Sequence, residues 1–145
     1  MKLLSEIRLP ARIESLEEAV SMVVAAAAQK GLQPEKISFL ELAVEEAVVN
    51  ICNYSYPGTD GNFDVRCMEE NGLLVTEIIN YGIPFDITTA PEPDVTKGLE
   101  ERQLGGLGIY FIRKFVDEVD YRREGSANIL RLGVKVGSVL PTDRK

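Results

Sequence analysis

Three polar side chains able to do chemistry, Glu46, Asn50 and Asn53, follow one another along a single face of a predicted helix. On this face of the helix the preceding side chains are apolar and are expected to face the core. One carboxylate and two carboxamides therefore follow on a face that begins as an apolar one. Side chains four residues apart lie about 5–6 Å from each other on a helix. Glu46 and Asn50 are therefore spaced to act on one small ligand or ion. The plainer alternative is a helix end that leaves the core, with Glu46 in solvent and Asn53 near the C-cap.

A second candidate segment, N-Y-G-I-P-F-D, begins at Asn80 directly after a predicted strand. Gly82 lets the backbone turn or approach a neighbour closely, and the side chain of Asn80 is expected to point into the space above the sheet. Residues 81–107 then form a connection without regular periodicity. A connection of this length in a small domain is usually functional.

A glycine cluster ends this connection and opens a predicted helix. It consists of Gly105, Gly106, Leu107 and Gly108. Glycines before a helix N-terminus expose N–H groups and the positive end of the helix dipole, which suits a phosphate group. A helix-entry turn without a ligand is the plainer alternative. The sequence contains neither the P-loop pattern nor the Rossmann glycine pattern.

The composition narrows the chemistry further. The chain has 145 residues, 45% of them apolar, a net charge of −7 and no histidine. Without histidine, Ser-His-Asp and Cys-His catalysis and most zinc sites are excluded, so acid–base chemistry falls to carboxylates, lysine or tyrosine. The acidic charge without a Lys/Arg cluster argues against direct binding to nucleic acid or a membrane surface. No apolar run is long enough to span a bilayer, and two cysteines without a framework favour a reduced, cytoplasmic setting.

The elements that must position these residues are predicted from periodicity and turn signals. Strands are expected over residues 3–9, 63–69, 73–80, 119–123 and 128–136, and helices over 15–30, 34–53 and 108–116. Ser15 and Glu18 form a capping-box pattern. Pro34 suits the first turn of the central helix, and Asn71-Gly72 is a hairpin signal.

This order of elements predicts an α+β fold, a two-layer sandwich with a mixed, mainly antiparallel sheet and helices on one face. The central helix would pack on the sheet through apolar residues at helical spacing. These residues are Ile37, Leu40, Val44, Ala47, Val48 and Ile51. No repeat or domain boundary is visible, so we expect one domain over residues 1–145, with about 137–145 as a flexible tail.

Taken together, the three motifs resemble the N, G1 and G2 boxes of the GHKL ATP-binding fold, also called the Bergerat fold. They are E-x-x-x-N on a helix, N-x-G-x-P-F-D after a strand and G-G-L-G at a helix start, in that order. The resemblance covers about residues 5–136. Within that superfamily the chain is similar to the anti-sigma factor serine/threonine kinases of bacterial partner-switching systems, especially in PFDITTAPEPD and EERQLGGLGIYFIRKFVDEVDY.

The resemblance implies a role for each matching residue. Glu46 would be the general base that activates the attacking hydroxyl, and Asn50 would coordinate a Mg²⁺ ion bridging the phosphates of ATP. Gly82 and Pro84 would form the turn under the adenine, and the G-G-L-G segment would form the lid over the phosphates. Asn53 has no definite family role and would neighbour the ligand.

Asn80 stands where the family has an aspartate that accepts from the adenine amino group. Its amide oxygen can still accept, but without the charge assistance that strengthens hydrogen bonds to a carboxylate. We expect measurable ATP binding, with ATP still the preferred nucleotide. We also expect weaker purine discrimination than with aspartate, since the amide could turn over to meet the carbonyl group of guanine.

The resemblance therefore predicts an ATP- and Mg²⁺-dependent protein serine/threonine kinase. It would phosphorylate a small STAS-type anti-sigma-factor antagonist, alternately sequester a sigma factor or an analogous target, and form homodimers. Two alternatives remain open. One is a GHKL-shaped binding or adaptor module with weak or no nucleotide turnover, which Asn80 favours. The other is a small ATPase without a protein acceptor.

Overall fold

The computed structural model describes residues 1–84, 114 and 116–136. Its regular elements are β1 (Lys2–Pro10), α1 (Leu16–Gln29), α2 (Pro34–Asn50), β2 (Asn62–Glu70), β3 (Leu73–Asn80), β4 (Glu118–Glu124) and β5 (Ala127–Lys135). A 3-10 turn, Ile13–Ser15, precedes α1, and a π-helical turn, Ile51–Ser55, continues α2. Almost all of the predicted helix 108–116, most of the connection 81–107 and the predicted tail 137–145 lie outside the described residues.

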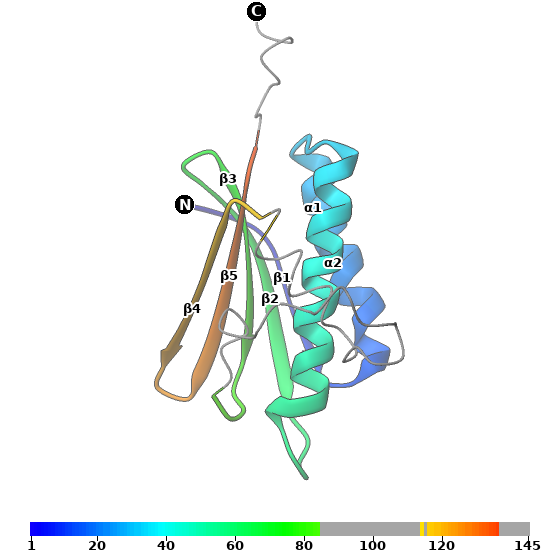
Figure 1. Ribbon diagram of the computed structural model, residues 1–145, viewed down its shortest axis with the longest axis vertical. Helices are drawn as coiled ribbons and strands as arrows, with labels where there is room; N and C mark the ends of the chain where they lie inside the picture. The colour runs from blue at the N-terminus through cyan, green and yellow to red at the C-terminus, as the bar shows by residue number, and fades with distance from the viewer. Residues whose placement is uncertain (85–113, 115, 137–145) are drawn as a thin grey trace, which may run out of the picture.

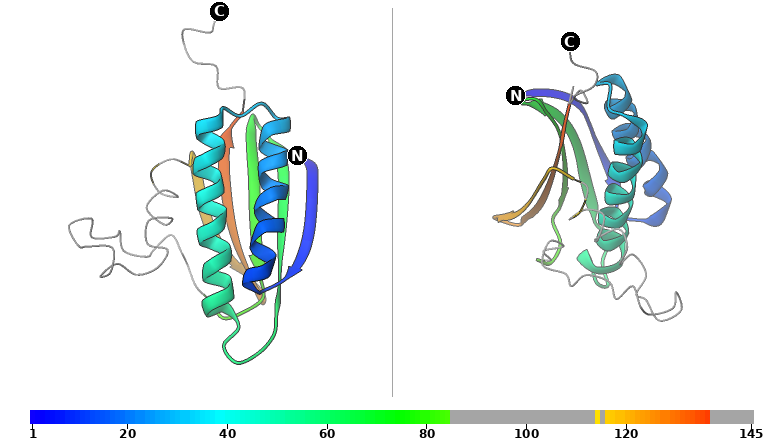
Figure 2. Two further views of the ribbon diagram at one scale, coloured as in Figure 1. Left: turned by 90° about the vertical axis from the view of Figure 1, so that its right-hand side faces the viewer. Right: turned by 45° about the horizontal axis from the view of Figure 1, so that its top comes forward.

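The strands form one sheet in the order β1-β2-β3-β5-β4, and the two helices lie side by side against one of its faces (Figure 1, Figure 2). The predicted two-layer α+β sandwich is confirmed. Every pairing among the described strands is antiparallel, where the sequence predicted a mixed sheet, because β5 runs opposite to β3. The β2–β3 hairpin turns at Asn71 and Gly72, whose φ angles of 51° and 79° fit the predicted two-residue turn.

The core lies between the helices and the sheet. On α2 the side chains of Leu40, Val44 and Val48 are at most 2% exposed, at the helical spacing that the sequence predicts. They belong to one buried cluster that includes Phe63 of β2 and Ile78 of β3. Burial of each such side chain contributes about 1.5–3 kcal/mol. This packing holds the C-terminal end of α2 against the ends of the central strands.

The helix ends differ from the sequence prediction in two places. The predicted capping box is wrong, because Ser15 has helical backbone angles and makes no capping hydrogen bond. Its hydroxyl instead donates to the Pro10 carbonyl at 2.7 Å, which ties the entry of α1 to β1. Pro34 lies in the first turn of α2 as predicted. However, α-helical geometry ends at Asn50 and not at Asn53, because the π-helical turn intervenes.

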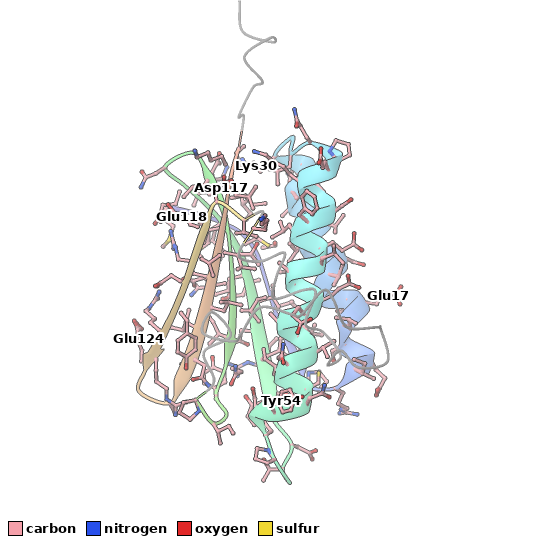
Figure 3. The ribbon with its side chains drawn as sticks, viewed as in Figure 1. Glu17, Lys30, Tyr54, Asp117, Glu118 and Glu124 are labelled. Atoms are coloured by element: carbon pink, nitrogen blue, oxygen red, sulfur yellow. The ribbon has the colours of Figure 1, made fainter. Side chains whose placement is uncertain are left out.

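Contacts at the opposite end of the molecule fix the helices and the outer strand. Lys30, after α1, forms a 2.8 Å ion pair with Glu69 of β2. Asp117 accepts from the backbone N–H of Lys135 at 2.8 Å, and Figure 3 labels both Lys30 and Asp117 at that end. Within the described ranges, no helix has the length and apolar character needed to cross a membrane.

Candidate functional site

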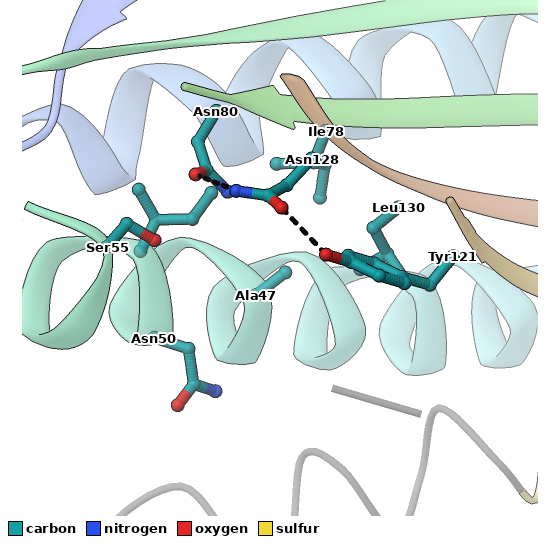
Figure 4. Close-up of a pocket in the computed structure, with 9 residues that line it drawn as sticks. Ala47, Asn50, Ser55, Ile78, Asn80, Tyr121, Asn128 and Leu130 are labelled. Carbon is teal, nitrogen blue, oxygen red and sulfur yellow. Dashed lines mark hydrogen bonds between the residues drawn. The ribbon is translucent and has the colours of Figure 1, made fainter. Parts of the chain in front are cut away.

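A pocket opens between the C-terminal end of α2 and the ends of the central strands (Figure 4). Its apolar wall consists of Ala47, Ile51, Ile78 and Leu130. Its polar lining consists of Asn50, Ser55, Asn80, Tyr121 and Asn128. An apolar cleft with a few converging polar groups is the usual form of a small-molecule site.

Asn80 and Asn128 face each other across the β3–β5 pairing and are only 8% and 2% exposed. Asn128 Nδ2 donates to Asn80 Oδ1 at 2.9 Å and to the carbonyl oxygens of Gly82 and Ile83 at 3.2 and 3.1 Å. The Gly82 N–H also donates to Asn80 Oδ1, at 3.0 Å. Since buried amides need partners, this network fixes the turn after β3 against β5.

The oxygen of Asn128 is held from the other side by β4. It accepts from the Tyr121 hydroxyl at 2.7 Å and from Arg123 Nη1 at 2.9 Å. The same Arg123 nitrogen donates to the Gly82 carbonyl at 2.9 Å. Three strands and the turn after β3 therefore position this end of the pocket.

Gly82 is required by its packing against the π-helical turn. A Cβ atom at this position would overlap the carbonyl oxygen of Ser55, and the N–H of Ile83 donates to that same oxygen at 2.9 Å. The predicted close approach at Gly82 is confirmed, with protein backbone as the neighbour. Single π-helical turns are frequent at functional sites, and this one brings the buried Ser55 into the pocket wall.

Glu46 lies next to the pocket through its contact with Asn50 and is 6% exposed. Asn50 Nδ2 donates to Glu46 Oε2 at 2.7 Å and to the Glu46 backbone carbonyl at 2.9 Å. Burial raises the pKa of Glu46 to about 7, and the hydrogen bond from Asn50 opposes this rise. The alternative of a solvated glutamate is therefore wrong. A carboxyl group with a pKa near neutrality can take a proton from a substrate.

Asn50 offers an oxygen to a cation. Its nitrogen faces the Glu46 carbonyl, which can only accept, so the amide orientation is fixed and Oδ1 is left without a partner among the described residues. Figure 4 shows this amide pointing away from Asn80 and Asn128, so the site has two separate polar ends. Mg²⁺ uses few protein oxygens and retains waters or phosphates, which fits a single carboxamide ligand.

The residues that the structure describes contain no group of three or more acidic, cysteine or histidine side chains that could hold a metal ion. A Mg²⁺ ion at Asn50 would therefore depend on ligands other than protein carboxylates. Nucleotide phosphates can supply such ligands. The donor set at this end fits a metal that enters with a nucleotide.

The predicted site residues fall into three groups. Asn50 and Asn80 line the pocket, and Gly82 holds Asn80 from behind. Asn53 and Pro84 are exposed and do not line the pocket. The chain leaves α-helical geometry after Asn50, so the α-helical spacing that was used to place Asn53 no longer applies. The cluster Gly105, Gly106, Leu107 and Gly108 lies outside the described residues.

The sequence motifs give no indication of Ser55, Tyr121 and Asn128, which complete the polar lining. Asn128 carries the clearest signal, because it begins the apolar segment N-I-L-R-L-G-V, in which a buried amide must find partners. Its pairing with Asn80 depends on the β3–β5 register, which no local pattern determines.

Residues 9–134 match the family model described as "Histidine kinase-like ATPase domain". The chain is 28% identical over 130 residues to the serine-protein kinase RsbW of Listeria monocytogenes serovar 1/2a, covering 86% of this chain and 83% of that protein. It is 29% identical over 129 residues to the anti-sigma F factor of Thermoanaerobacter sp. strain X514, covering 86% of this chain and 90% of that protein.

Among solved structures, the chain is similar to the crystal structure of the RsbU and RsbW domains of Rv1364c from Mycobacterium tuberculosis. The TM-score is 0.63 at 15% sequence identity, and the match covers 92% of this chain and 33% of that longer chain. At this identity the likeness concerns the fold, two helices against an antiparallel sheet.

Proposed function

This chain belongs to the family of histidine kinase-like ATPase domains, whose model spans residues 9–134, and from that premise we propose that it is a nucleotide-dependent protein serine/threonine kinase. It binds ATP and Mg²⁺ in the pocket at the end of α2 and transfers the γ-phosphate to a serine or threonine hydroxyl of a partner protein. The observation that carries this proposal is the Glu46–Asn50 pair beside the pocket. It places a carboxyl group with a raised pKa next to an amide oxygen that has no partner among the described residues.

The geometry of the pocket supports a proposed role for each of its parts. The apolar wall and the Asn80–Asn128 end would receive the purine base. Asn50, at the other polar end, would hold a Mg²⁺ ion, which would supply neutralisation of phosphate charge. The oxygen of the acceptor hydroxyl forms a bond to the γ-phosphorus, and Glu46 takes the proton from this hydroxyl. The bond between the γ-phosphorus and the bridging oxygen of the β-phosphate breaks, and ADP leaves. The G-G-L-G segment, including Gly105, Gly106, Leu107 and Gly108, stays the proposed phosphate lid.

The partners follow from the distant homology to a serine-protein kinase RsbW and to an anti-sigma F factor. We propose that the phosphate acceptor is a STAS-type anti-sigma-factor antagonist, that the chain alternately binds a sigma factor or an analogous target, and that it acts in the cytoplasm as a homodimer. The acidic chain, with a net charge of −7, favours protein partners over nucleic acid.

Incubation of the protein with Mg²⁺, γ-labelled ATP and a candidate antagonist tests this function. We expect label on a serine or threonine of the antagonist, and transfer that is slower by about 10²–10⁴-fold when Glu46 is replaced by glutamine. Glu45→Gln is the matched control, since Glu45 precedes Glu46 on the same helix but is not part of the pair with Asn50. Nucleotide binding without phosphate transfer to any antagonist would contradict the proposed kinase activity.

A second candidate function is a binding module without turnover. The observation that favours it is that Asn80 already uses both acceptor positions of its amide oxygen within the protein, so adenine finds no free acceptor there. In this case a sigma factor or analogous target would bind equally well with and without nucleotide. A nucleotide-dependent change in target affinity would exclude it.

A further inference from the structure

The amide of Asn128 can lie in only one orientation. Its Nδ2 faces the carbonyl oxygens of Gly82 and Ile83, which can only accept. Its Oδ1 faces Arg123 Nη1, which can only donate. Turning the amide over would place nitrogen against a guanidinium and oxygen against two carbonyls. The chemistry of these neighbours therefore fixes which end of the amide is nitrogen and which is oxygen.

The orientation of Asn128 determines that of Asn80. The atom of Asn80 that receives the Asn128 Nδ2–H also receives the backbone N–H of Gly82, at 2.9 and 3.0 Å. Both neighbours are donors, so this atom must be the oxygen, and its two lone pairs are used. The sequence-based expectation that the Asn80 amide could turn over is therefore wrong. The Nδ2 of Asn80 has no partner among the described residues, although this side chain lines the pocket.

The pocket thus presents a hydrogen-bond donor where the family motif has a carboxylate acceptor. The other polar group on the α2 side of this end is the hydroxyl of Ser55, which is 4% exposed, lines the pocket and has no side-chain partner in the part of the chain that the structure describes. A hydroxyl can donate or accept. The pair Asn80 and Ser55 therefore offers one fixed donor and one adaptable group.

The purine bases differ in where they carry hydrogen-bond donors and acceptors at ring positions 6 and 1. Adenine carries a donor, its amino group, at ring position 6 and an acceptor at N1, whereas guanine and hypoxanthine carry an acceptor at position 6 and a donor at N1. Asn80 Nδ2 can donate to the oxygen of a 6-oxopurine while Ser55 Oγ accepts from its N1–H. Adenine would place its amino group against the Asn80 donor, which leaves both groups unpaired.

We propose that this site selects 6-oxopurine nucleotides, GTP and ITP, over ATP, with Asn80 as the specificity-determining residue and Asn128 as the residue that orients it. The inference rests on the proposed nucleotide site and narrows its substrate class. ATP remains a weaker ligand. With a 6-oxopurine, Asn80 Nδ2 makes one hydrogen bond, whereas with adenine both Asn80 Nδ2 and the 6-amino group are left unpaired. This difference is worth about tenfold in affinity.

Calorimetry on the wild-type chain with Mg²⁺ tests this without any variant. GTP, ITP, ATP and purine riboside triphosphate, which carries only hydrogen at position 6, are compared. We expect GTP and ITP to bind about tenfold more tightly than ATP, and the 6-hydrogen compound to bind at least as well as ATP. Tighter binding of ATP than of ITP and GTP would overturn the selectivity while leaving the nucleotide site intact. Failure of all four nucleotides to bind would overturn both the selectivity and the proposed function.

Asn80→Asp provides the second arm. One carboxylate oxygen keeps the hydrogen bonds from Gly82 and Asn128, and the other becomes an acceptor toward the pocket, so the preference should reverse in favour of ATP. The matched control is Asn71→Asp, which adds the same charge at the exposed β2–β3 turn and should leave the preference unchanged. Unchanged selectivity in a folded Asn80→Asp protein would remove Asn80 from this role.

Discussion

The amide nitrogen of Asn50 donates hydrogen bonds to two oxygens of Glu46, the side-chain Oε2 at 2.7 Å and the backbone carbonyl oxygen at 2.9 Å. One residue thus fixes the position of the proposed base and at the same time turns its own oxygen outward. Because the two roles share a single amide, replacing either residue should change the behaviour of the other.

The proposed base is tested by Glu46→Gln, which keeps the size and helix propensity of the side chain but cannot accept a proton. We expect nucleotide binding to persist while phosphotransfer falls by about 10²–10⁴-fold, the usual contribution of a general base. The measurement is single-turnover transfer from Mg²⁺-nucleotide, beside Glu45→Gln as control. Transfer at a near-normal rate in Glu46→Gln would remove Glu46 from the mechanism.

The raised pKa of Glu46 also predicts a pH dependence of stability. In the unfolded chain this carboxyl ionises near its ordinary value of 4.5, whereas in the folded protein its pKa is about 7. The folded state therefore favours the protonated form. The contribution of Glu46 to the free energy of unfolding should be largest below about pH 4.5 and should decrease as the pH rises toward 7. The size of the effect is at most about 3 kcal/mol.

Chemical denaturation of wild type and Glu46→Gln between pH 5 and 8 measures this contribution. Glutamine cannot ionise, so the variant should lack this decrease and should be more stable than wild type at pH 8. Equal pH dependence in the two proteins would show that Glu46 titrates normally. Phosphotransfer by the wild type should also increase with pH as the base becomes ionised.

Asn50→Ala should affect both the metal and the base. Alanine is well tolerated in a helix, so loss of the amide oxygen should weaken the Mg²⁺-nucleotide more than the metal-free nucleotide. Loss of the hydrogen bond that lowers the pKa of Glu46 should move the pH profile of any remaining transfer upward. Calorimetry with and without Mg²⁺ separates these effects. An equal loss of affinity for both forms would contradict the metal assignment.

The sequence predicts the helix with Glu46 and Asn50 well, because a single helical period places both and needs no tertiary information. It fails for Asn53, because the chain changes to π-helical geometry after Asn50, in a turn that contacts Gly82 from a distant part of the sequence. The hairpin at Asn71 is likewise local and is predicted correctly.

The orientation of Asn80 could not be predicted for a different reason. It depends on Asn128, which lies 48 residues further along the chain, and on Arg123 and Tyr121 of β4 that hold Asn128 in turn. Such a network exists only once the β3–β5 and β4–β5 registers are formed. Motifs identify which residue types meet at the site, whereas the direction of each donor comes from the folded sheet.

The last prediction concerns Gly82→Ala. The added Cβ would overlap the Ser55 carbonyl oxygen, so the turn after β3 must move away from the π-helical turn, at a cost of about 1–3 kcal/mol or more. This movement also withdraws the Gly82 N–H from Asn80, so purine selectivity should weaken together with stability. The matched control is Gly31→Ala, where the space is open and only the φ of 79° resists a side chain. It should cost about 1 kcal/mol and leave nucleotide binding unchanged. Thermal unfolding and competition between ATP and ITP measure both effects, and a Gly82→Ala protein with wild-type stability would show that the turn does not need the close contact.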